Sequence, residues 1–154
     1  MATHWLNETE MRGWRALIEN FGPLVAALEA DLVPHGLSLG DYEVLVILSE
    51  TPDRQLRMCD LADRLGLSPS GLTRRLDGLV RAGFVLRTAS SGDRRVINAT
   101  ITATGYAALE RAAPTHLASV RDRLVDRLTH EQLATLGDIF LAVGSGLGRS
   151  VDAA

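Results

Sequence analysis

Between Ser68 and Val80 the sequence brings hydroxyl and guanidinium side chains together at helical spacing. Ser70, Thr73 and Arg74 fall on one side of a helix over this segment. The other side carries an apolar stripe of Leu72, Leu76, Leu79 and Val80. Hydroxyls and guanidinium groups donate hydrogen bonds to phosphates and to base edges. The segment is therefore typical of a DNA recognition helix.

The start of this helix is well defined. The hydroxyl of Ser68 can accept a hydrogen bond from the first turn, and Pro69 suits the first helical position. Arg75 lies next to the apolar stripe, so its stem can run along the core while its guanidinium reaches Asp77 or a phosphate. We expect Ser68, Ser70, Thr73, Arg74 and Arg75 to form the DNA-binding face.

A second basic group lies at the tip of a predicted hairpin. Residues 84–88 and 96–101 are rich in β-branched and apolar side chains, and they flank a polar turn. The turn contains Gly92, Asp93, Arg94 and Arg95. Two adjacent arginines on a narrow tip suit insertion into a minor groove. A hairpin that follows a recognition helix makes a winged helix.

The distribution of charge agrees with this interpretation, although the net charge of the whole chain is −3. From Arg54 to Arg95, nine arginines stand against four aspartates, so this segment carries +5 and the remainder −8. A basic centre between acidic ends is expected if the middle meets phosphate and the ends meet protein or solvent.

Three further signals place helices and links around the recognition helix. Ser38 and Asp41 predict a cap for a helix that Pro52 closes. Residues 55–57 read as an extended link, and residues 58–65 as a helix that Gly66 ends. The short connection 66–68 is the one expected in a helix-turn-helix.

Long amphipathic helices are expected at both ends. Residues 8–32 carry apolar side chains at spacings of three and four, with a kink or short break expected at Pro23. Thr102 can cap a helix running towards Leu128, in which Pro114 threatens a kink, and Thr129 and Gln132 form a capping box for a last one. These helices have more apolar surface than a small head needs, which favours a dimer over the alternative that they only cover their own core.

The composition argues against several other classes of protein. The chain contains no phosphate-binding glycine motif, nucleophile–base pattern or helix with paired histidines, so we expect no enzyme activity and no cofactor. Its four histidines lack metal-ligand spacing, and a single cysteine, Cys59, excludes an internal disulfide and is read as structural. With no signal sequence or membrane span recognised, we expect a cytoplasmic location without membrane contact.

Several local sequences resemble the multiple antibiotic resistance regulator (MarR) family of bacterial winged-helix repressors. They are Asp93-Arg94-Arg95 in the wing, residues 101–105 after it, and residues 72–79 and 83–87 before it. The resemblance implies one mainly α domain over 1–154 with a small β-hairpin wing. It implies a winged helix-turn-helix head at 38–102 and dimerisation helices at 5–34 and 103–147.

Functionally, the resemblance implies a homodimeric DNA-binding transcriptional regulator, expected to be a repressor, on a pseudo-palindromic operator. Its half-sites would lie about 34 Å apart. Ser70, Thr73, Arg74 and Arg75 would meet bases and phosphates, and Arg95 would enter the minor groove. Arg94 would contact the backbone, and Asp93 would brace the wing arginines.

Members of this family are commonly released from DNA by small aromatic or anionic effectors. Thr73 and Arg87 match positions associated with anion binding in one branch, although Arg87 could equally contact a phosphate. Trp14 and Arg15 are further candidates, with Trp14 also readable as stalk core. The alternative is a winged helix that binds DNA without an effector, or one that binds protein.

Overall fold

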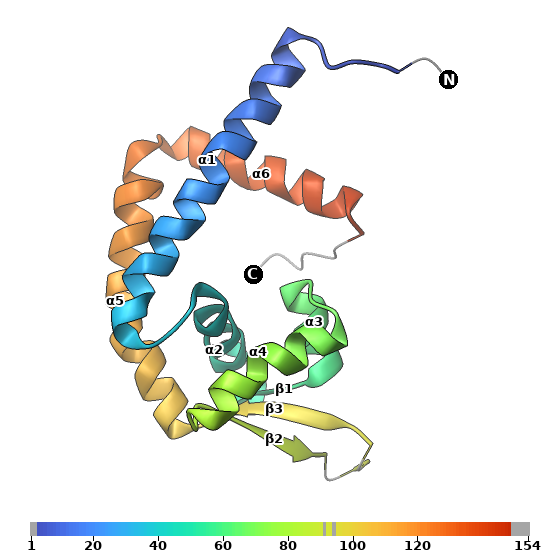
Figure 1. The fold of residues 1–154 in the computed structure, drawn as a ribbon, viewed down its shortest axis with the longest axis vertical. Helices are drawn as coiled ribbons and strands as arrows, with labels where there is room; N and C mark the ends of the chain where they lie inside the picture. The colour runs from blue at the N-terminus through green and yellow to red at the C-terminus, as the bar shows by residue number, and fades with distance from the viewer. Residues whose placement is uncertain (1–2, 91, 94, 149–154) are drawn as a thin grey trace.

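The computed structural model describes residues 3–90, 92–93 and 95–148, and it has a compact head and an arm of long helices (Figure 1). The arm consists of α1 (Glu8–Leu32), α5 (Ala103–Arg123) and α6 (His130–Gly146). The head lies between α1 and α5 in the chain, and its described residues form three α-helices, two short 3-10 helices and a small sheet. The predicted class, mainly α with a winged helix-turn-helix, is confirmed.

The head helices begin and end where the capping residues predict. They are α2 (Leu39–Glu50), α3 (Met58–Leu65) and α4 (Pro69–Arg81). Ser38 and Asp41 form a capping box at the start of α2. Gly66 ends α3 with φ of 64°, in the left-handed region that glycine tolerates best. The chain therefore turns sharply from α3 into α4.

The wing belongs to a three-stranded antiparallel sheet in the order β1-β3-β2. Its strands are β1 (Gln55–Arg57), β2 (Val85–Ala89) and β3 (Ile97–Ile101). The predicted hairpin is β2 with β3, and Val85 pairs with Ile101 at its base. The extended link predicted at 55–57 also joins the sheet, with Leu56 opposite Ala99. The hairpin is therefore anchored along both sides of β3.

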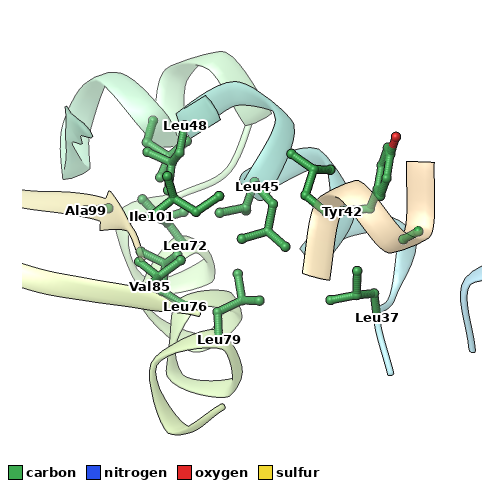
Figure 2. Packing of buried hydrophobic residues seen from close by; sticks show 14 of the residues in the cluster. Leu37, Tyr42, Leu45, Leu48, Leu72, Leu76, Leu79, Val85, Ala99 and Ile101 are labelled. Atoms are coloured by element: carbon green, nitrogen blue, oxygen red, sulfur yellow. The ribbon is translucent and has the colours of Figure 1, made fainter. Parts of the chain in front are cut away.

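The core of the head lies between α2, α4 and the sheet (Figure 2). The apolar stripe predicted for the recognition helix is buried, since Leu72 and Leu76 have no exposed surface and Leu79 retains 2 %. These leucines meet Leu45 and Leu48 of α2 and strand residues of the wing base (Figure 2). The opposite face of α4 is consequently turned to solvent.

The arm differs from the sequence expectation in two places. The break considered at Pro23 does not occur, because α1 is one continuous helix in which Pro23 is exposed and removes a single backbone donor. Helix α5 ends at Arg123 rather than near Leu128, and the short 3-10 helix η3 (Val125–Arg127) follows it. Pro114 likewise lies inside α5 without ending it.

A polar cluster joins α1 to α5. Asp31 accepts a hydrogen bond at 2.7 Å from the hydroxyl of Ser119, and it forms an ion pair at 2.7 Å with the guanidinium of Arg123. Helix α6, by contrast, buries none of its described residues within the chain. No helix in the described part of the chain is both long enough and apolar enough to span a bilayer.

Candidate nucleic-acid interface

Helix α4 presents a polar outer face whose first turn is capped by its own sequence. The Ser68 hydroxyl accepts a hydrogen bond from the backbone N–H of Gly71 at 3.1 Å and lies 3.2 Å from the Ser70 hydroxyl. Thr73 donates its hydroxyl hydrogen to the carbonyl of Pro69 at 2.9 Å, and its lone pairs remain available. Ser68, Ser70, Thr73 and Arg74 are all exposed. The sequence-predicted reading face is thus accessible.

Arg75 occupies a different position from the other predicted contacts. It is half-buried, and its guanidinium lies directly against Gly40 at the start of α2. A β-carbon at position 40 would overlap that guanidinium. The stem of Arg75 therefore runs along the core, as its place beside the apolar stripe indicates. Its head group does not pair with Asp77, which was one of its expected partners.

The partner of Asp77 is Arg87 of the wing. The Arg87 Nη1 atom lies 2.9 Å from Asp77 Oδ1, and its Nη2 donates to the carbonyl of Thr73 at 2.7 Å. The two side chains are 27 % and 50 % exposed. Arg87 Nε is buried without a hydrogen-bond partner in the described residues. Opposite charges on elements that the fold brings together are the one signal for this pairing that sequence reasoning could have used.

At the wing tip, Asp93 organises the turn. Its carboxylate accepts a hydrogen bond from the backbone N–H of Arg95 at 2.9 Å, and its carbonyl accepts one from Val96 at 3.0 Å. Among the described groups, Asp93 thus braces the backbone of the wing rather than an arginine side chain. Arg95 is exposed. Arg94, the other predicted wing contact, lies outside the described residues.

A pocket of about 460 Å³ lies where the wing meets α3 and α4. Three guanidinium side chains line it, together with the Thr73 side chain and four less polar residues, which are Met58, Cys59, Val96 and Ile97; the arginines are Arg57, Arg87 and Arg95. Two of the predicted effector residues, Thr73 and Arg87, therefore share one cavity. A cavity with guanidinium donors and apolar walls is chemically suited to a small anion whose remaining surface is apolar.

The remaining predicted effector residues lie elsewhere. Trp14 and Arg15 belong to α1, and neither lines this pocket or the second described pocket, on α6. Trp14 is 54 % exposed, so it is not core within one chain. Cys59 is a free, exposed thiol that donates to Asp60 at 3.3 Å. No group of three possible metal ligands occurs among the residues that the structure describes.

Sequence comparison relates this chain to known transcriptional regulators. A family model described as MarR family matches residues 37–97. The repressor YetL of Bacillus subtilis, described as an HTH-type transcriptional repressor, is 34% identical over 108 residues. That alignment covers 68% of this chain and 65% of YetL.

Solved structures extend the similarity to nearly the whole chain. AbsC from Streptomyces coelicolor, described as a MarR family transcriptional regulator, is 36% identical with a TM-score of 0.91, over 96% of this chain and 100% of AbsC. Sco3205 from the same organism was solved in complex with DNA. It is 37% identical with a TM-score of 0.91, over 95% of this chain and 92% of Sco3205.

Proposed function

This chain belongs to the MarR family of transcriptional regulators, and we propose that it is a repressor that binds a pseudo-palindromic DNA operator as a homodimer. In this proposal, residues 38–102 form the head that meets DNA. Residues 5–34 and 103–147 form the dimerisation helices. The two recognition helices enter successive major grooves about 34 Å apart.

The observation that carries the proposal is the exposed outer face of α4 beside an arginine-bearing wing. Ser70 and Arg74 project from the helix face opposite its buried leucines. Arg95 is exposed on the turn that follows β2. This pairing supplies donors for base edges and phosphates in the major groove and a guanidinium for the adjacent minor groove. The DNA complex of the similar protein Sco3205 supports the same mode of action.

The surface area of the chain supports a dimer. The chain exposes 10858 Å². A compact monomer of this mass exposes about 7,600 Å². The excess of about 3,300 Å² per chain is at least as large as one partner's share of an obligate dimer interface, which buries about 2,000–5,000 Å² over both partners.

The excess surface includes exposed apolar faces of two arm helices. Apolar side chains neither form ion pairs nor bind metal ions, so these faces are suited to burial against protein. On α1 the exposed residues are Trp14, Leu17, Ile18 and Phe21, and on α6 they are Ile139, Phe140, Leu141 and Val143. A second copy of the chain can cover both faces at once, because a twofold axis brings the same faces together.

The pocket between the wing and α4 is the proposed effector site. Thr73 and Arg87 line it with two further guanidinium groups, and Arg87 Nε has no partner in the described residues. A small aromatic or other apolar anion would pair with the guanidinium groups that line the pocket and fill the apolar wall. Because the pocket includes Arg95, such a ligand would act at the wing itself and release DNA.

The decisive experiment is selection of a binding site from random duplex DNA, followed by titration of the selected site at fixed salt. We expect a two-fold symmetric sequence, and we expect Arg95→Ala to abolish tight binding while the protein stays folded. Arg12→Ala is the matched control, because it removes the same charge from the N-terminal turns of α1, far from the sheet (Figure 1).

Selection that yields no preferred sequence would refute this DNA-binding function, and equal affinity of Arg95→Ala and Arg12→Ala would refute the wing contact of Arg95. The effector is tested separately by screening small aromatic carboxylates for thermal stabilisation and then for release of DNA. If none does both, the result favours the alternative, an effector-independent DNA-binding protein.

A further inference from the structure

One guanidinium ties the wing to the recognition helix at two points. Arg87 projects from β2 and contacts both the Asp77 carboxylate, at 2.9 Å, and the Thr73 carbonyl, at 2.7 Å. These two acceptors lie four residues apart, one turn along the same flank of α4. A planar guanidinium that spans them fixes both the rotation of α4 and its distance from the strand.

The other flank of α4 is held separately. Leu72, Leu76 and Leu79 bury the inner face, and Arg75 packs against Gly40 of α2. The Thr73–Asp77 flank meets the middle of β2 through Arg87. Arg87 is the second residue before the end of β2, which continues into the turn carrying Arg95. The contacts of Arg87 therefore lie between the outer face of α4 and Arg95, the two parts of the head that would meet DNA.

From this geometry we infer that Arg87 is a positioning residue that, through Asp77, locks the recognition helix and the wing into one rigid DNA-binding unit. The expected effect on DNA binding rests on the proposed function. The contacts between Arg87 and α4 can be tested in the free protein. It assigns Asp77, an acidic residue on a DNA-facing helix, a role that favours DNA binding. We call the two contacts of Arg87 the helix–wing clamp.

The helix–wing clamp predicts a change in DNA affinity that neither the loss of a phosphate contact nor a change in helix stability predicts. Removing the Asp77 charge makes the face more positive, which by electrostatics alone strengthens DNA binding. Alanine is also a better helix former than aspartate, so the helix itself is favoured. If the clamp operates, Asp77→Ala weakens binding in spite of both effects.

The test measures operator affinity for Asp77→Ala, Arg87→Lys and the double variant. We expect each to weaken binding about five- to tenfold, less than the full effect of one charge-assisted hydrogen bond because both side chains are partly exposed, with no further loss in the double variant. Arg87→Lys keeps the charge but cannot span both acceptors. Asp63→Ala, an exposed change of equal charge on α3, is the control and should bind as well as or better than the unchanged protein.

A second measurement needs no DNA. Hydrogen exchange of the β2 and β3 amides should be faster in Asp77→Ala and Arg87→Lys than in Asp63→Ala, with α2 amides unchanged. Equal exchange in all three variants would overturn the inference, as would unweakened operator binding by Asp77→Ala. If the unchanged protein selects no DNA site, the proposed function fails while hydrogen exchange still decides whether the clamp exists.

Discussion

The ring of His116 on α5 lies 4.4 Å, centroid to centroid, from the ring of Tyr42 on α2, with the planes tilted by 42°. This contact joins the arm to the head at the base of α2. His116 Nδ1 is buried without a hydrogen-bond partner in the described residues. Burial lowers the pKa of His116 below its usual 6.5, and the nearby Glu43 carboxylate partly opposes that shift.

A half-buried histidine with a lowered pKa makes stability depend on pH. Between the lowered pKa and 6.5, the unfolded chain binds the proton more strongly, so the free energy of unfolding falls as pH falls through this window. Its contribution is fully present above pH 6.5. His116→Phe keeps a ring against Tyr42 but cannot titrate. In urea denaturation at pH 7.5 and 5.5, the variant should lose less stability on acidification, and an equal loss in both proteins would contradict the assignment.

Phe21→Glu should convert the proposed dimer into monomers. Phe21 is 55 % exposed on the apolar face of α1, and a carboxylate buried there without a partner is costly. Sedimentation equilibrium measures the change in mass. Ala16→Glu is the control, because helical spacing places it on the other face of α1 and it should leave the dimer intact. A dimer that tolerates both changes would show that α1 is not the interface.

Arg74→Ala should weaken operator binding. Arg74 is exposed on the outer face of α4 and has no hydrogen-bond partner in the described part of the chain, unlike Arg87. If it contacts a phosphate, the slope of log affinity against log salt should become shallower by about one. If it reads a base, the preference among operator variants should change instead. Unaltered affinity and preference together would remove Arg74 from the interface.

Gly40→Ala should expel the Arg75 guanidinium from the start of α2. The added β-carbon would overlap a flexible side chain rather than backbone, so the fold should survive. Arg75→Ala should then restore part of the lost stability. Thermal or urea unfolding of the two single variants and the double variant gives a cycle, with an expected coupling of about 1 kcal/mol. Simple additivity would show that the two residues do not meet in solution.

Local signals in the sequence predicted most of the fold. The side chains of Ser38, Ser68, Thr102 and Thr129 all cap helices where they were expected to, because a cap depends on residues within one turn of it. Continuity of α1 through Pro23 was less predictable. A proline costs one hydrogen bond locally, and packing against α5 decides whether the helix survives that cost.

The contacts of the candidate interface were harder to predict than its residues. The predictions that Ser70, Thr73 and Arg74 share an outer face needed only helical periodicity. The pairing of Asp77 with Arg87 depends on how a strand crosses a helix ten residues away. The contact of Arg75 with Gly40 likewise depends on how two helices pack. The pairing of β1 in the sheet was hard to predict for another reason, because three residues are too few to show a strand period.

The flanks that hold α4 in place are separate from the residues that would read DNA. Arg87 bonds to a backbone carbonyl and to Asp77, and the leucines bury the inner face of α4. Ser70 and Arg74 take no part in either set of contacts. Substitutions at Ser70 and Arg74 can therefore alter sequence preference without tilting the helix. A head built in this way can diverge towards new operators by single steps, and its reading residues can be exchanged with those of relatives as a set.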